Sequence, residues 1–182
     1  PPADGDEGSM PPMSGKQRPR RILQVLPRME MGEMEQGALD VAQAVAQRGD
    51  TALVASAGGT LALELPGVGA EHVPLSLHQG APWRIWANAR RLKEIIETRG
   101  VDLVHARSRA TAWAAHRAAR QAGVPLVTTF HAAYRFRAEM ERRYNAVMAM
   151  GDRVIAVSDF IAWHLRAHYA VDGGRIRVVP PG

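Results

Sequence analysis

Apolar residues along the chain form short continuous runs that alternate with longer stretches in which they recur every three or four positions. Short runs are typical of strands buried on both faces of a parallel sheet, whereas the longer spacing is typical of helices with one buried side. The runs predict strands over residues 22–26, 51–55, 72–75, 103–106, 126–129, 154–157 and 176–179. The periodic stretches predict helices over residues 35–48, 60–65, 82–99, 110–122, 137–150 and 158–168. This alternation predicts an α/β fold: a doubly wound, mostly parallel sheet with helices on both faces.

The two ends of the chain lack this rhythm. Residues 1–19 hold five prolines and three glycines, so we expect a disordered tail there. A Rossmann-like domain is predicted over residues 20–179. Residues 180–182, Pro-Pro-Gly, cannot continue a helix, so we expect them to begin a linker toward a second domain that this chain does not contain.

The formal net charge of +5 favours anionic partners, such as phosphorylated ligands, nucleic acid or an anionic membrane surface. No basic helix with base-reading neighbours stands out, so no nucleic-acid partner is expected. The absence of cysteine excludes a disulfide framework, a thiolate metal site and a cysteine nucleophile. No H-E-x-x-H pattern occurs either, and neither a metal nor a cofactor is predicted. Without a run long enough to span a bilayer or a signal pattern, we expect a cytoplasmic protein, or a peripheral one at the inner membrane.

In a doubly wound sheet, ligands collect at the carboxyl ends of the strands. The first such loop, residues 27–37, runs into a helix N-terminus that favours anions, and it contains Gly32 and Glu33. A loop that only turns the chain is the alternative. The loop lacks G-x-G-x-x-G, which argues against a nicotinamide oxidoreductase.

Four further candidates follow later strands. His131 comes after the strand at 126–129 and could bond a sugar hydroxyl or place a cation near developing charge. Arg107 and Arg109 could hold a phosphate or carboxylate. Ser158 is best explained as the N-cap of the next helix, with ligand binding as the alternative. For the histidine and the two arginines the alternative is a solvated loop side chain.

The helix predicted over residues 82–99 carries two stripes. The core stripe consists of Ile85, Ala89, Leu92 and Ile96. A neighbouring stripe of aromatic residues followed by cations is typical of a segment that rests on an anionic membrane, and it consists of Trp83, Trp86, Arg90 and Lys93. The alternative is that both tryptophans pack under a loop while the cations face water.

Five segments in order resemble the family 4 glycosyltransferases. The first, residues 22–49, carries a V-L-P, a glycine, a glutamate and an L-D-x-A pattern. The others are VDLVHARSR at 101–109, VTTFH at 127–131, GDRVIAVS at 151–158 and RIRVVPPG at 175–182. The resemblance covers residues 20–182.

The resemblance implies a GT-B enzyme, in which two Rossmann-like domains face a cleft and the first domain receives the acceptor. It also implies a retaining, metal-independent transfer from a nucleotide sugar. In this comparison Gly32 matches the first glycine of a pair, His131 matches a histidine that faces the transferred sugar, and Arg107, Arg109 and Ser158 line the cleft. Three residues depart from the pattern: Glu33 replaces the second glycine, Ala132 replaces a glycine, and Pro181 replaces a polar residue.

We therefore expect the N-terminal half of a glycosyltransferase that builds a bacterial surface glycan of lipopolysaccharide or capsule type. The expected partners are a nucleotide sugar, a glycan or lipid-linked acceptor and a C-terminal donor domain. We expect this chain to be inactive alone. Two alternatives remain open: a nucleotide-sugar epimerase of the same fold, and a non-catalytic module that binds a glycan or a partner protein.

Overall fold

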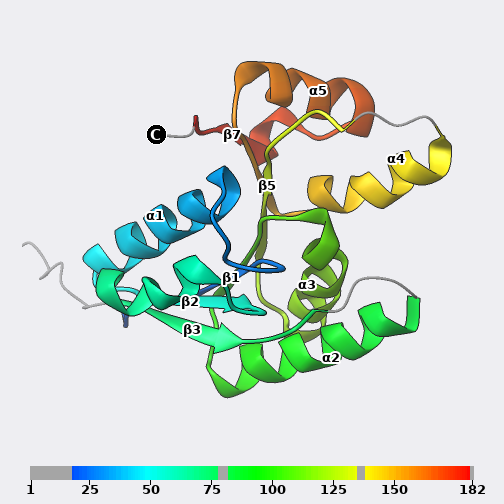
Figure 1. Cartoon of the computed structure of the whole chain (residues 1–182). Helices are drawn as coiled ribbons and strands as arrows, with labels where there is room; N and C mark the ends of the chain where they lie inside the picture. Colours follow the sequence, from blue (N-terminus) through cyan, green and yellow to red (C-terminus); the bar gives the residue numbers. More distant parts are fainter. Residues whose placement is uncertain (1–17, 78–81, 135–137, 181–182) are drawn as a thin grey trace, which may run out of the picture.

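The fold was analysed in a computed structural model that describes residues 18–77, 82–134 and 138–180 (Figure 1). A single parallel sheet of seven strands, in the order β3-β2-β1-β4-β5-β6-β7, forms its centre. The strands are β1 (Arg21–Val25), β2 (Thr51–Ser56), β3 (Ala70–Pro74), β4 (Leu103–Ala106), β5 (Leu126–Phe130), β6 (Arg153–Ala156) and β7 (Ile176–Val178). The predicted doubly wound α/β fold is confirmed, and the sheet is parallel throughout.

Five α-helices and four 3-10 helices connect the strands in the described part of the chain. The α-helices are α1 (Glu33–Gln47), α2 (Pro82–Thr98), α3 (Arg109–Ala122), α4 (Glu139–Asn145) and α5 (Asp159–Tyr169). The 3-10 helices are η1 (Thr60–Leu63), η2 (Leu65–Val68), η3 (Ala146–Ala149) and η4 (Gly173–Arg175). All seven predicted strands and four of the five long predicted helices are found, with shifts of a few residues at their ends.

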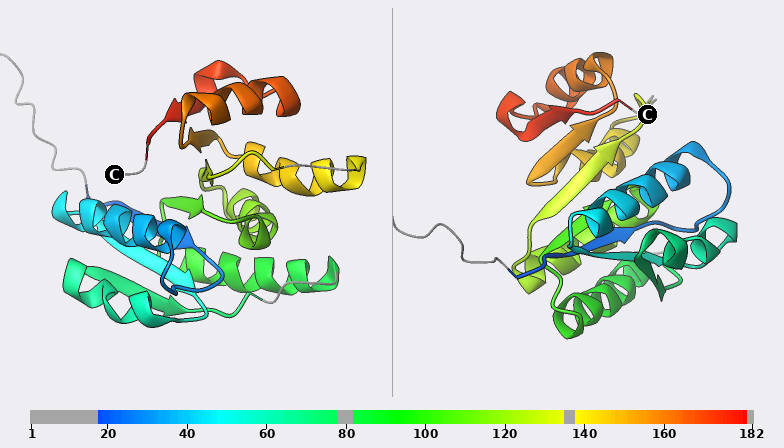
Figure 2. Two further views of the ribbon diagram at one scale, coloured as in Figure 1. Left: turned by 45° about the horizontal axis from the view of Figure 1, so that its top comes forward. Right: turned by 90° about the vertical axis from the view of Figure 1, so that its left-hand side faces the viewer.

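Two cores lie on opposite faces of the sheet. The smaller core joins Leu26, which follows β1, and the strands β2 and β3 to α1, η1 and η2, and it includes Leu39 and Leu65. The larger one lies under α2 and α3 and continues to η3 and α5, with Leu92 and Phe130 fully or almost fully buried. Figure 2 shows α1 on one side of the sheet and α2 with α3 on the other. The central strands β1 and β2 are therefore largely buried on both faces, as their continuous apolar runs predicted, whereas Ile155 of β6 is half-buried and Val178 of β7 is exposed.

Helices differ from the prediction where local chemistry interrupts them. The helix predicted at 60–65 is two 3-10 helices that meet at Glu64, and Pro66 lies in the first turn of the second. Proline fits a first turn because the amide it lacks would have no intrahelical partner there. The helix predicted at 137–150 is α4 followed by η3, and residue 137 lies outside the described residues.

The described chain begins within the predicted tail. The Arg18 guanidinium forms an ion pair with Asp102, and the Arg20 amide donates to Asp50 Oδ1 over 2.8 Å. The remainder of the predicted tail, residues 1–17, lies outside the described residues, as do residues 181 and 182 of the predicted linker. Within the described ranges, no helix is both long and apolar enough to span a bilayer.

The order of the strands reverses between β1 and β4. The chain winds outward from β1 through β2 to β3, then returns to β4 on the other side of β1 and winds outward again. In open α/β sheets the loops part at such a switch point and leave a crevice beyond the carboxyl ends of the strands. The expected ligand site is therefore near the ends of β1 and β4.

Candidate functional site

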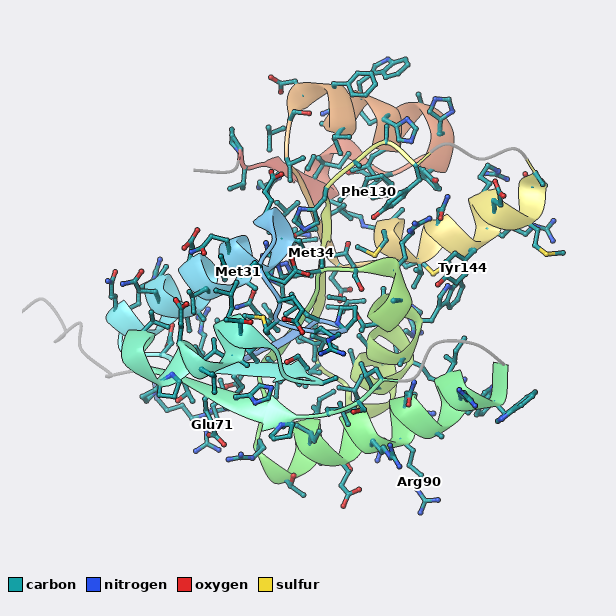
Figure 3. All side chains as sticks on the ribbon, in the orientation of Figure 1. Met31, Met34, Glu71, Arg90, Phe130 and Tyr144 are labelled. Atoms are coloured by element: carbon teal, nitrogen blue, oxygen red, sulfur yellow. The ribbon has the colours of Figure 1, made fainter. Side chains whose placement is uncertain are left out.

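A pocket of about 260 Å³ lies at the carboxyl edge of the sheet, between α1 and the ends of β4, β5 and β6. It is lined by Glu33, Gln36, Gly37, Asp40, Val41, His105, Arg107, Thr129, His131, Ile155, Val157, Val179 and Pro180. Met31 and Met34, labelled in Figure 3, lie at the N-terminal end of α1. We call this the switch-point pocket. It brings together three of the predicted site residues, namely Glu33, Arg107 and His131.

His105 forms part of the pocket's floor. Its Nε2 lies 2.7 Å from Thr129 Oγ1, so β4 and β5 are joined by a buried side-chain hydrogen bond. Burial, followed by the charge of Arg107 and the neighbouring His131, lowers the pKa of His105 to about 3. The imidazole is therefore uncharged near pH 7, and its hydrogen bond holds the side chain of Thr129 in place.

His131 follows the last residue of β5 and is half-buried. Its Nε2 is buried and has no hydrogen-bond partner among the described residues. Burial, followed by the charge of Arg107, lowers the pKa of His131 to about 4. A neutral imidazole with an unpaired nitrogen can donate to or accept from a ligand hydroxyl. Of the two roles predicted for His131, the lowered pKa favours the hydrogen-bonding role over the cationic one.

Arg107 supplies the positive charge of the pocket. Only 6% of its surface is exposed, and its Nε has no hydrogen-bond partner in the described part of the chain. Burial lowers its pKa to about 10, against the opposing effect of Glu35 and Asp40, so the guanidinium stays charged near pH 7. A buried cation with an unused donor is costly unless a ligand or a counter-charge satisfies it.

The first turns of α1 form the polar wall of the pocket. Glu33, Gln36 and Asp40 lie at the three- and four-residue spacings that place side chains on one side of a helix. Their carboxylate and amide oxygens accept hydrogen bonds, whereas Arg107 donates them. Such a mixture of donors and acceptors suits a ligand with several hydroxyl groups.

The loop between β1 and α1 is held in place by the glycine turn after β2. The Met29 amide donates to the Gly58 carbonyl over 2.8 Å, and the Leu61 amide donates to the Met29 carbonyl over 2.8 Å. Gly59 has φ of 134°, and a Cβ there would lie 2.4 Å from the Met29 carbonyl oxygen. Only glycine meets both conditions, so this turn fixes the loop that leads into the pocket.

Three predicted site residues do not line the pocket. Gly32 precedes α1 in an extended conformation, with φ of −176°, and its carbonyl accepts from the Gln36 amide. Ser158 caps α5, because its hydroxyl accepts from the Ile161 amide over 3.3 Å. Arg109 points to a different group: its Nη1 donates to Asn145 Oδ1 over 2.7 Å, and its guanidinium carbon lies 4.1 Å from the centre of the Tyr134 ring.

The predicted membrane-facing stripe lies on the outer side of α2. Trp83 and Trp86 are 71% and 60% exposed, so neither indole packs under a loop. Lys93 forms an ion pair with Glu97, over 2.6 Å. The core stripe of the same helix is confirmed for Ala89, Leu92 and Ile96, which are buried, while Ile85 is half-buried.

One metal-like spacing is present in the sequence. His164 and His168 stand four residues apart on α5, with ring centres 4.5 Å apart. No group of three or more histidine, aspartate or glutamate side chains that could hold a metal ion is found among the described residues.

Four polar residues of the pocket were not predicted: Gln36, Asp40, His105 and Thr129. Gln36 and Asp40 carried a usable signal, since they continue the helical spacing from Glu33. His105 and Thr129 stand inside apolar runs, so the sequence alone does not mark them as site residues. Their hydrogen bond becomes visible only when β4 and β5 are known to be neighbours.

Comparison with known proteins places this geometry in context. A profile described as Glycosyltransferase Family 4 matches residues 34–182. The chain is 37% identical over 93 residues to D-inositol 3-phosphate glycosyltransferase of Nocardiopsis dassonvillei, an alignment that covers 44% of this chain and 22% of that protein.

Solved structures agree with this match. A glycosyltransferase from Rickettsia africae ESF-5 superposes with a TM-score of 0.78 at 35% identity, over 90% of this chain and 43% of that one. Anabaena HepE in complex with UDP and glucose superposes with a TM-score of 0.68 at 19% identity, over 88% of this chain and 44% of that one. The chain thus spans less than half the length of these proteins.

Proposed function

The chain belongs to Glycosyltransferase Family 4, and we propose that it forms the acceptor-side half of a GT-B enzyme that transfers a sugar from a nucleotide sugar. The switch-point pocket receives the acceptor and faces a donor-binding domain in the natural gene product. The acceptor is a glycan or lipid-linked precursor of a bacterial surface glycan. The transfer retains the configuration at the sugar carbon and requires no metal ion.

The observation that carries this proposal is the buried Nε2 of His131 at the switch point, for which the described ranges supply no hydrogen-bond partner. A neutral imidazole there can hold a sugar hydroxyl without adding charge to the pocket. Arg107 and the polar wall of α1 supply further donors and acceptors around the same space. A hydroxyl-rich substrate satisfies these groups better than an apolar one, because each unpaired buried polar atom costs free energy.

Two observations support a nucleotide sugar as the sugar donor, namely the fold and the positive net charge. HepE, whose structure contains UDP and glucose, shares this fold at low identity. In the proposed enzyme the leaving diphosphate is stabilised by basic groups and helix N-termini rather than by a cation. Most of those groups belong to the donor domain, so this chain by itself has no transferase activity.

Product analysis of the natural gene product tests the proposal. We expect sugar transfer from a nucleotide sugar only when a glycan acceptor is present, with unchanged rates after chelation by EDTA. Conversion of the nucleotide sugar without an acceptor would instead identify an epimerase. Binding of glycan with no turnover of any nucleotide sugar would identify a binding module.

A further inference from the structure

Two neighbouring helices form a surface that the switch-point pocket does not use. The helices α2 and α3 pack side by side along the outside of the fold (Figure 1). Exposed or half-buried side chains from both make up what we call the basic-aromatic face: Trp83, Trp86, Arg90, Lys93, Arg117 and Arg120. Arg90 extends from α2 away from the sheet (Figure 3).

Trp86 and Arg117 join the two helices on this face. The Arg117 guanidinium carbon lies 3.3 Å from the centre of the Trp86 ring, so a cation is stacked on an exposed indole. Hollows of about 480 and 410 Å³ open on either side of this pair. The stacked guanidinium keeps its charge at the surface, since a ring face attracts the cation without neutralising it.

The charge of the face is not balanced from within. Residues 82–93 and 109–122 contain no aspartate or glutamate. Lys93 shares its charge with Glu97, but no ion pair of Arg90, Arg117 or Arg120 is found within the described ranges. The face therefore combines two exposed indoles with three arginines for which the described residues show no ion pair.

We infer that the basic-aromatic face docks onto an anionic lipid bilayer. Indoles favour the boundary between lipid headgroups and acyl chains, and each nearby cation gains from the negative surface potential. A protein partner fits less well, because charged residues are depleted from the centres of protein interfaces, whereas here Arg90, Lys93 and Arg117 line one hollow with Trp86. The inference stands on the surface of α2 and α3 and does not depend on the proposed function.

One end of the basic-aromatic face lies near the carboxyl edge of the sheet. Because α2 follows β3, its first two turns, which carry Trp83 and Trp86, lie toward the edge at which the parallel strands end. The switch-point pocket opens at the same edge, but on the opposite face of the sheet, beside α1. A docked bilayer would thus lie near the edge that carries the pocket without covering the pocket.

Vesicle flotation of the 182-residue chain tests the inference. We expect flotation with phosphatidylcholine vesicles that contain about one-third phosphatidylglycerol, and about tenfold weaker binding to pure phosphatidylcholine. A Trp83→Ser/Trp86→Ser variant should lose about tenfold or more in affinity. The matched control is Phe160→Ser/Trp163→Ser, which removes an exposed aromatic pair at the same spacing from α5 and should change affinity by no more than about twofold.

A variant that removes two cations measures the electrostatic contribution to vesicle binding separately from that of the indoles. Arg90→Ser/Arg120→Ser should reduce binding to anionic vesicles about tenfold and leave binding to neutral vesicles unchanged. Arg48→Ser/Arg166→Ser, which removes two exposed cations elsewhere, is its control. Equal binding to anionic and neutral vesicles would overturn the inference, as would equal losses in the α2 and α5 aromatic variants. Tight binding of a single-stranded oligonucleotide that requires Trp83 and Trp86, without vesicle binding, would reassign the face to nucleic acid.

Discussion

Arg107 lies against Gly37 of α1, since a Cβ atom on Gly37 would lie 2.8 Å from Arg107 Nη2 and the guanidinium would have to move. Gly37 stands inside α1, where glycine is otherwise unfavourable relative to alanine by about 1 kcal/mol. The glycine therefore lowers the stability of α1 locally, and the guanidinium of Arg107 lies in the space that a side chain at position 37 would fill. The pair links the composition of α1 directly to the charge of the site.

A double-mutant cycle measures this relationship. Gly37→Ala should leave the free energy of unfolding unchanged or lower it, because the new methyl group displaces a buried guanidinium. In an Arg107→Ala background the same substitution should raise the free energy of unfolding by about 0.5–1 kcal/mol, the ordinary gain in a helix. Urea denaturation of the four proteins provides the values. An equal gain in both backgrounds would show that the two side chains do not compete for space.

Arg107 and Arg109 should differ in what their loss changes. Arg107→Ala removes a buried cation of the pocket, so we expect kcat/KM of the natural gene product to fall by about tenfold or more. Arg109→Ala leaves the amide of Asn145, which is 2% exposed, without its donor and should lower the free energy of unfolding by about 1–2 kcal/mol. Its kcat/KM should change by less than about threefold. The reverse pattern would place Arg109, and not Arg107, at the substrate.

The buried His105 should make the domain sensitive to acid. Its pKa in the folded protein is lowered to about 3, whereas the unfolded chain takes up a proton near the ordinary value of 6.5. Below that value the unfolded state binds more protons, so stability is complete above about pH 6.5 and is lost as the pH falls toward 3. Denaturation at about pH 7.5 and pH 5 should show a smaller difference for His105→Gln than for the wild type. The quantity to compare is the change in the free energy of unfolding between the two pH values, because loss of the hydrogen bond to Thr129 lowers stability at both. An unchanged difference would contradict the burial of a neutral imidazole.

The turn after β2 should tolerate no side chain. Gly59→Ala introduces a Cβ 2.4 Å from the Met29 carbonyl oxygen at φ of 134°, so we expect a loss of about 2 kcal/mol or more in the free energy of unfolding. Gly67→Ala is the matched control, since a Cβ there meets nothing within 4 Å. Thermal unfolding of both variants would decide the point, and equal melting temperatures would show that the loop after β1 does not depend on this turn.

The fold could be predicted from the sequence because its signals are local. Continuous apolar runs such as residues 22–26 mark buried strands, and Gly123 ends α3 in the left-handed conformation that glycine favours at this place. The same local information fails at residues 146–149, where α4 tightens into a 3-10 turn before the buried Gly151. This turn is bonded to β5, because the Thr128 hydroxyl donates to the Met148 carbonyl over 2.6 Å, and such a long-range contact is not visible in the local sequence.

The site could be predicted only in part. Its edge follows from topology, and Glu33, Arg107 and His131 follow from their places after strands. Arg107 and Arg109 could not be distinguished, since both stand after β4 and only the packing of α4 shows that Arg109 turns toward Asn145. The lowered pKa of His131 could not be predicted from the sequence either, because it results from burial and from the nearby charge of Arg107.

The turnover of a His131→Ala variant of the natural gene product tests the central claim most directly, namely that the switch-point pocket binds the reacting sugars through a neutral histidine. We predict a loss in kcat/KM of well over tenfold, equivalent to about 1.4 kcal/mol or more. His131→Gln should recover part of the loss, and His168→Ala, on the exposed side of α5, should match the wild type. Unchanged kinetics in His131→Ala, with the fold intact, would contradict the claim.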